Sequence, residues 1–177
     1  MSFKIGDRVV HPQYGVGSVV TLEDREFGTG VVRKYYEVSI PDGSTVWVPV
    51  RDGASGLRKL ATRAEIASCR MILGSRPSAL PEDARMRHSE LTAHLKEGTI
   101  AAHCEVVRDL AAYGAHKTTM GNIGVFLRAT QDVLSQEWAM VEGTTLASAV
   151  YEISSLLEKG RQMINETAPS RIPQVQG

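Results

Sequence analysis

The amino-acid sequence predicts an α+β protein with two domains, a small antiparallel β-barrel followed by an all-α helical domain. Up to about Leu60, runs rich in Val and Tyr alternate with glycine and proline turns. Beyond Leu60 the apolar residues recur every three or four positions, and Ala, Leu, Arg and Glu become common. We therefore predict a β domain in residues 1–60, a helical domain in residues 61–165 and a flexible tail in residues 166–177.

Four or five strands are expected in the N-terminal part, where turn-forming residues separate four extended runs. Such residues cluster at positions 12–17, at 28–30 and at 41–43, where the sequence reads Pro-Asp-Gly. Closure into a barrel is the usual way in which so short an antiparallel sheet avoids open edges. The predicted strands are residues 8–10, 16–23, 32–40 and 44–50.

Five helical stretches are expected after residue 60. The first follows Thr62, whose side chain can form a capping box with Glu65, and it ends at residues 74–77. The next three are expected at residues 82–96, from residue 100 to a stop at Gly114, and at residues 122–141. The last is predicted from an apolar stripe of Leu146, Val150, Ile153 and Leu157.

Composition excludes several classes of protein. Lys plus Arg number 20 and Asp plus Glu number 20, so the overall charge does not indicate a nucleic acid, a membrane surface or an acidic substrate as partner. Cys69 and Cys104 lie in no zinc-ligand pattern, and we expect both to be reduced, buried thiols. No apolar run approaches the roughly 20 residues that span a bilayer, and no signal-peptide segment opens the chain. We therefore expect a cytoplasmic protein without membrane contact.

Motifs of catalysis are absent from the sequence. There is no Walker loop, no GxGxxG, no HExxH and no GxSxG, each of which places a phosphate, a metal or a nucleophile. The 5 histidines are scattered, without the spacing of four that brings two metal ligands onto one helical face. We expect a protein that is not an enzyme, with no catalytic residues, metal, cofactor or small-molecule substrate.

The two tryptophans are expected to have different roles. Trp47 alternates with Val46 and Val48, so it points away from the barrel core if the valines point into it. An outward tryptophan on a strand is a natural anchor for a partner protein, although a helix of the second domain could cover it instead. Trp138 shares a helical stripe with Leu134 and is predicted to lie in the core.

Basic residues gather around the predicted domain junction. This local basic surface is compatible with contacts to DNA phosphates, and a solvated helix face explains it equally well. The residues are Arg58, Lys59, Arg63, Arg70, Arg76, Arg85 and Arg87.

Three segments of the chain resemble a known family. Residues 3–20, FKIGDRVVHPQYGVGSVV, are similar to the start of the CarD/CdnL family of bacterial transcription regulators. The same module occurs as the polymerase-interacting domain of the transcription-repair coupling factor. Residues 46–49, VWVP, and residues 105–110, EVVRDL, match later parts of the family in the same order. The resemblance covers about residues 3–160.

The resemblance implies a Tudor-like, SH3-like barrel that docks on the β subunit of RNA polymerase. It also implies that the helical domain contacts promoter DNA at the upstream edge of the transcription bubble, and that the protein stabilises the open promoter complex. The polymerase-contacting segments of the family match Arg25, Glu26 and Phe27 in one hairpin, and Trp47 on the late strand. Family members often have a basic residue at the position of Trp47.

The DNA-contacting side departs from the family. Family members carry a tryptophan early in the second helix of the helical domain, which wedges into the minor groove. Its position matches Ala84, or Asp83 with a different gap, and neither side chain can act as a wedge. Arg85 and Arg87 remain as candidate phosphate contacts, so we expect weaker or altered promoter contact. The alternative is an adaptor whose helical domain contacts protein instead of DNA.

Overall fold

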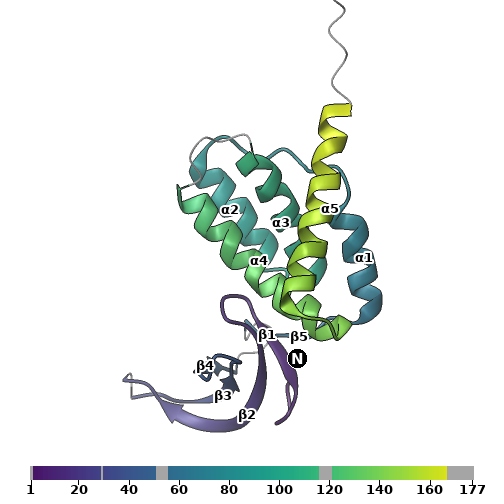
Figure 1. Ribbon diagram of the computed structural model, residues 1–177. Helices are drawn as coiled ribbons and strands as arrows, with labels where there is room; N and C mark the ends of the chain where they lie inside the picture. The colour runs from purple at the N-terminus through teal and green to yellow at the C-terminus, as the bar shows by residue number, and fades with distance from the viewer. Residues whose placement is uncertain (1, 29, 51–55, 116–120, 167–177) are drawn as a thin grey trace, which may run out of the picture.

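An antiparallel sheet and a bundle of helices, formed by successive parts of the chain, make up the structure (Figure 1). The computed structural model describes residues 2–28, 30–50, 56–115 and 121–166. The strands are β1 (Arg8–His11), β2 (Gly15–Glu26), β3 (Val32–Ser39), β4 (Thr45–Pro49) and β5 (Arg58–Lys59). The helices are α1 (Arg63–Leu73), α2 (Ala84–Leu95), α3 (Ile100–Ala115), α4 (Gly121–Glu142) and α5 (Leu146–Glu166). The predicted α+β class is confirmed, whereas the predicted tail lies almost wholly outside the described residues.

The sheet has the strand order β4-β3-β2-β1-β5, and each pair of adjacent strands is antiparallel. The four strands with predicted bounds are present, and β5, with only 2 residues, is a fifth, in agreement with the expected four or five. One face packs into a core in which the Phe3 backbone N–H donates to the Tyr36 hydroxyl at 3.1 Å. In the described residues β4 and β5 are the two ends of the ladder, and closure into a barrel stays a prediction. The core residues are Phe3, Val9, Val19, Tyr36, Val38, Ile40, Val48 and Leu57.

The first helix begins where the sequence predicted. The Thr62 hydroxyl accepts from the Glu65 backbone N–H at 3.2 Å, and the Glu65 carboxylate accepts from the Thr62 backbone N–H at 2.7 Å. This capping box satisfies two of the helix N–H groups that lack partners in the first turn. The helix buries Ile66, Cys69 and Leu73, as expected from their spacing.

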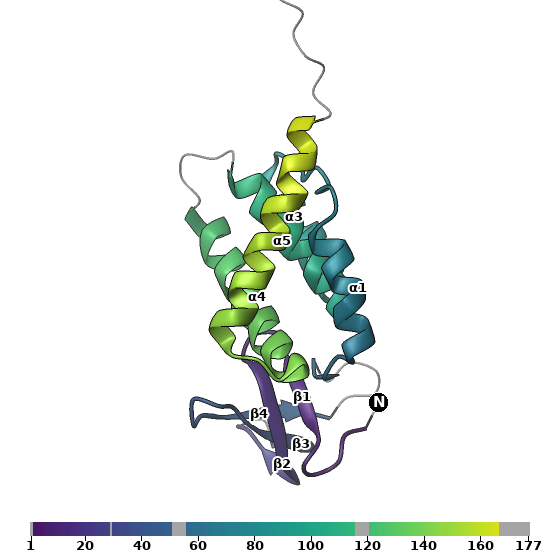
Figure 2. The same ribbon diagram turned by 45° about the vertical axis from the view of Figure 1, so that its right-hand side comes forward.

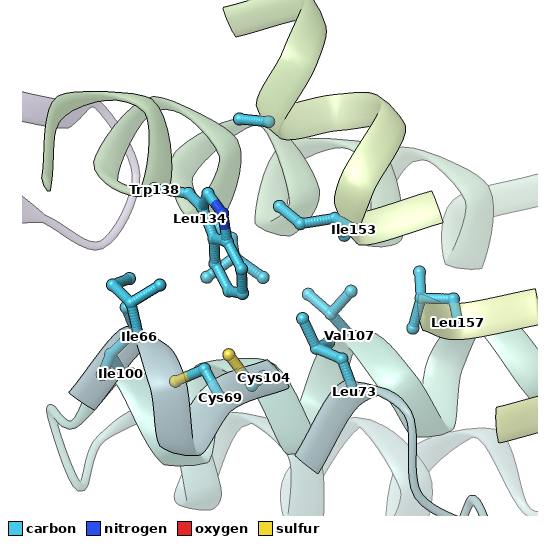
Figure 3. Close-up of a cluster of buried hydrophobic side chains, with 11 residues drawn as sticks. Ile66, Cys69, Leu73, Ile100, Cys104, Val107, Leu134, Trp138, Ile153 and Leu157 are labelled. Carbon is cyan, nitrogen blue, oxygen red and sulfur yellow. The ribbon is translucent and has the colours of Figure 1, made fainter. Parts of the chain in front are cut away.

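The core of the bundle is formed by α1, α3, α4 and α5 around Trp138 (Figure 3). Trp138 is fully buried, and its indole N–H donates to Glu152 Oε2 at 2.9 Å, so its predicted place in the core is confirmed. Cys69 and Cys104 are buried free thiols, also as predicted. The hydrogen bond between the two thiols and burial together raise the pKa of Cys104 well above its usual value.

The predicted end of the third helix is wrong by one residue. Gly114 was expected to stop this helix, but α3 continues to Ala115, and Gly114 is a buried residue within it. A glycine inside a helix costs only about 1 kcal/mol relative to alanine, which packing against neighbouring helices can offset. The helix is therefore described up to residue 115, and residues 116–120 lie outside the described part of the chain.

The predicted face of the last helix is also partly wrong. Leu146 and Val150 are 52% and 45% exposed, whereas Ile153 and Leu157 are buried as expected. The buried stripe instead begins at Ala149 and packs against the core of the bundle. Large apolar side chains led the sequence-based interpretation to the wrong face at the start of α5, because the small Ala149 carries little signal.

Gly160 sets the approach of α5 to the segment after α1. A Cβ atom at this position would lie 2.5 Å from the Ser75 carbonyl oxygen and 3.0 Å from the Leu73 carbonyl oxygen. Neither backbone oxygen can move without shifting the end of α1. The glycine is thus required by a close helix-to-backbone contact.

Replacing Gly160 with alanine is expected to lower the free energy of unfolding by about 1–3 kcal/mol, because the added methyl group overpacks this contact. Helix propensity alone predicts the opposite sign, a gain of about 1 kcal/mol. Urea denaturation measures the difference, with Ser155→Ala on the exposed side of α5 as the matched control. A Gly160→Ala protein that is as stable as the wild type would refute the close contact.

A buried ion pair joins the sheet to the bundle. The guanidinium of Arg58 in β5 donates two hydrogen bonds to the carboxylate of Glu137 in α4. The Ala61 backbone N–H donates to the same carboxylate at 2.9 Å, and Glu137 is 0% exposed. An apolar cluster of Val10, Val16, Val133 and Leu60 lies between β1, β2 and α4. The sheet and α4 therefore form a continuous packed interface (Figure 2).

The turn between β1 and β2 fits closely against α4. Gly15 has a φ of +78°, and a Cβ there would lie 2.0 Å from the side-chain Oε1 of Gln136. The positive φ favours glycine at this position, whereas the close atom belongs to the end of a flexible side chain that can move. Gly15, in the Tyr14-Gly15 pair of the opening segment, thus lies at the junction between the sheet and the bundle.

Candidate functional site

Four side chains gather on the outer face of the sheet and form what we refer to as the outer cluster: Arg25, Phe27, Tyr35 and Trp47. The Arg25 guanidinium carbon lies 4.1 Å from the centre of the Trp47 ring. The Phe27 ring is 4.9 Å from Tyr35, edge to face, and 6.5 Å from Trp47. A cation over an aromatic face and edge-to-face rings are both favourable arrangements. Phe27 is 48% exposed, so the cluster is accessible from outside.

Strand alternation explains why these residues share a face. In the ladder Trp47 is opposite Glu37, and Tyr35 is opposite Pro49 and Glu23, so their side chains leave the sheet on the same side. Val48 points the other way and is 4% exposed in the sheet core. The predicted outward direction of Trp47 is therefore correct. The sequence interpretation missed Tyr35, although the same alternation along β3 could have identified it.

The helices of the bundle do not cover the outer cluster. Helix α4 contacts the sheet through β2, and the apolar contact there involves Val10 of β1 and Val16 of β2. β4, which carries Trp47, is the edge strand at the opposite end of the ladder from β1 and β5. Trp47 itself is partly buried, and the arrangement favours an outward-pointing anchor over a tryptophan covered by a helix.

Glu26 is separate from the other predicted polymerase-contacting residues. Its carboxylate accepts from the Gly30 backbone N–H at 3.1 Å, at the end of the hairpin formed by β2 and β3. Arg25, by contrast, donates from Nε to Glu23 Oε2 at 3.1 Å while lying over Trp47. The structure brings together Arg25, Phe27 and Trp47, and it places Glu26 where it shapes the turn.

The three residues predicted to contact DNA differ in their surroundings. Ala84 and Arg85 are exposed in the first turn of α2, whereas Arg87 is only 7% exposed. The Arg87 Nη1 donates to the Pro81 carbonyl at 2.7 Å and to the Tyr113 hydroxyl at 2.8 Å. Its guanidinium also stacks on the Tyr113 ring at 4.5 Å. These contacts join the start of α2 to α3, so Arg85 is the exposed cation of the three.

Most of the basic side chains around the predicted domain junction make contacts within the structure. Arg58 pairs with Glu137, and Arg70 donates to Glu152 at 2.6 Å and to Glu142 at 3.0 Å. Arg63 donates to the Val141 carbonyl at 3.4 Å. With Arg87 also engaged, four of the seven predicted cations make contacts within the structure. The local basic surface is therefore smaller than the sequence indicated.

The EVVRDL segment in α3 has a structural role that the sequence did not reveal. Glu105 Oε2 lies 2.5 Å from His94 Nε2 of α2. The Arg108 Nε donates to Asp109 Oδ1 at 2.7 Å, and this carboxylate accepts from the Ser78 backbone N–H at 2.9 Å. The polar residues thus hold α2 and the segment after α1 against α3. The apolar members, Val106, Val107 and Leu110, are buried.

Folding shifts the pKa of His94, which belongs to this network. Partial burial opposes its charge, but hydrogen bonds to Glu105 and Glu97 raise the pKa of His94 above its usual value. A pKa raised by folding adds stability that is fully present below the unfolded value of about 6.5 and is lost as pH rises through the folded value. His94 therefore stabilises the fold more in mild acid than in mild alkali.

We expect His94→Ala to lower the free energy of unfolding, relative to the wild type at the same pH, by more at pH 5.5 than at pH 8. Urea denaturation of both proteins at the two pH values checks this, and His88→Ala serves as a control because His88 is exposed in the same helix. An equal loss at both pH values would show that His94 acts by packing alone.

No helix in the described residues is long and apolar enough to pass through a membrane. Within the same residues, no group of three or more His, Cys, Asp or Glu side chains is arranged to hold a metal ion.

The sheet matches a known domain family. Residues 3–61 match the family described as the CarD-like/TRCF RID domain, and this range contains all five strands and the outer cluster. The N-terminal part of the chain is thus similar to a CarD-like RID domain, and the resemblance that the sequence indicated is confirmed there.

A relative extends this likeness into the bundle. The chain is similar to a protein of Bacillus subtilis (strain 168) with the name "Putative transcription factor YdeB". The two are 27% identical over 149 residues, which cover 81% of this chain and 94% of the relative. Because 81% of the chain is more than the sheet alone, the similarity extends into the helical part.

Proposed function

We propose that the protein is a non-enzymatic, cytoplasmic transcription regulator that docks on the β subunit of RNA polymerase through its sheet. The observation that carries this proposal is the outer cluster on a sheet whose sequence matches a RID domain. Aromatic residues and arginine are the commonest anchors of protein interfaces. A rigid sheet presents them without a large loss of conformational entropy on binding.

The edge of the sheet supports the same proposal. β4 pairs on one side with β3 and is the end of the ladder in the described residues. An edge strand offers backbone N–H and C=O groups to an added strand of a partner. Trp47 lies on this strand, so pairing at the edge and insertion of an aromatic anchor would occur together.

The helical part is proposed to approach promoter DNA near the upstream edge of the bubble. Ala84 stands where the family has its wedge, and Arg85 is exposed beside it, so contact with DNA is weaker or altered. The protein then acts by shifting the equilibrium between closed and open promoter complexes. Its effect is limited to the difference between its affinities for the two complexes.

A second candidate is an adaptor whose helical part contacts protein. The engagement of Arg87 by Pro81 and Tyr113, together with Ala84 at the wedge position, favours it. The two candidates share the docking of the sheet and differ in the partner of the bundle.

Salt dependence of DNA binding separates the two candidates. Binding of the full chain to a fluorescent promoter duplex, alone and with RNA polymerase, is measured from 50 to 300 mM salt. Phosphate contacts predict a steep loss of affinity with salt, and an Arg85→Ala protein should show a smaller slope. An adaptor predicts no added DNA affinity at any salt concentration, although the protein still binds polymerase.

A further inference from the structure

A groove runs between α2 and α4. Helix α2 rests mainly on α3, and a space of about 640 Å³ remains between it and the start of α4. The groove is crossed at one point by a contact between the rings of His88 and Phe126, at 5.9 Å. Its apolar part includes Leu91, Ile123 and Phe126.

The rim of the groove is basic. Arg85 and Lys96 are both exposed and both line the groove, one near each end of α2. They share a helical face with Ser89 and Thr92, because positions that differ by three or four residues lie on one side of a helix. No aspartate or glutamate is among the described residues that line the groove. Glu97, the nearest acid in sequence to Lys96, is hydrogen-bonded to His94.

We propose that this groove binds an acidic amphipathic helix of a partner protein. An apolar groove flanked by positive charge is complementary to a helix with one apolar face and carboxylates at its margins. The 12 residues of α2 span about 18 Å, the length of roughly three helical turns. This surface belongs to the bundle alone, so the inference rests on the second candidate, the adaptor, and does not depend on docking of the sheet.

Duplex DNA is a less suitable occupant of the groove. Phosphates would contact Arg85 and Lys96, but they would leave the partly exposed apolar side chains Ile123 and Phe126 without a matching surface. An apolar face on the partner would remove the exposed parts of these side chains from water. The combination of an apolar interior and a basic rim therefore favours a protein helix.

The test uses a fluorescein-labelled 16-residue helical peptide, designed with leucines along one face and glutamates beside them, and measures its anisotropy with the full chain. Reversing both rim charges, Arg85→Glu with Lys96→Glu, is expected to weaken binding about tenfold or more. A peptide with lysines in place of the glutamates should bind the reversed protein better than it binds the wild type. The matched control, Lys34→Glu with Lys59→Glu, reverses two exposed cations outside the groove and should bind like the wild type.

The proposal would be overturned if the folded wild type did not bind the acidic peptide, or if reversing Arg85 and Lys96 left peptide binding unchanged. It would also be overturned if a labelled DNA duplex bound through these residues while the peptide did not bind. Circular dichroism of each variant establishes that it is folded. Failure of this test leaves binding of the sheet to polymerase unaffected, so the two proposals are separable.

Discussion

Glu137→Ala is expected to lower the free energy of unfolding by about 3–5 kcal/mol, because it leaves the partly buried Arg58 guanidinium without its carboxylate. The same change removes the acceptor of the Ala61 backbone N–H. Urea denaturation followed by circular dichroism measures the loss. Glu158→Ala is the matched control, since Glu158 pairs with Arg161 at an exposed site of α5, where ion pairs contribute little.

A double variant tests the mechanism of this loss. Arg58→Met with Glu137→Leu removes both charges, and it is expected to be more stable than Glu137→Ala because no buried charge is left unpaired. If the double variant were as unstable as the single one, the loss would come from packing between the sheet and α4, and not from an orphaned cation.

Trp47→Ala is expected to weaken binding to a polymerase β-subunit fragment by about 2 kcal/mol or more, which is roughly thirtyfold in Kd. Trp47 contacts both Arg25 and Phe27, so its removal disrupts the whole outer cluster. The fold should change little, because Trp47 lies outside the buried core of the sheet. Isothermal titration calorimetry measures binding, and Tyr151→Ala controls for loss of an exposed aromatic residue on α5.

Phe27→Ala distinguishes a cluster from a single anchor. If the aromatic residues act together, Phe27→Ala also weakens binding, and the double variant with Trp47→Ala loses less than the sum of the two single losses. Undiminished binding by a folded Trp47→Ala protein would mean that the outer cluster is not the docking surface.

Local signals made most of the fold predictable. The capping box of Thr62 and Glu65 depends on residues three apart, and the outward direction of Trp47 depends on alternation along one strand. Such features need no knowledge of distant parts of the chain. The start of α2 was nearly right for the same reason, since Asp83 caps it by accepting from the N–H groups of its first turn.

Features that depend on distant residues could not be predicted. Glu137 resembles any surface acid of a helix, and only the approach of Arg58, 79 positions away, makes it a buried partner. Arg87 was assigned to DNA because neither Tyr113 nor the Pro81 carbonyl could be placed near it from sequence. Family resemblance indicated three members of the outer cluster. The fourth, Tyr35, became evident only from the pairing of strands in the structure.

Amide hydrogen exchange of the full chain, with and without the polymerase β-subunit fragment, tests docking through the sheet most directly. The proposed function predicts slower exchange on binding at β4 and at the hairpin of β2 and β3 beside Trp47, with α5 unchanged. Protection confined to the helices, or a folded protein with no protection anywhere at saturating fragment, would contradict it.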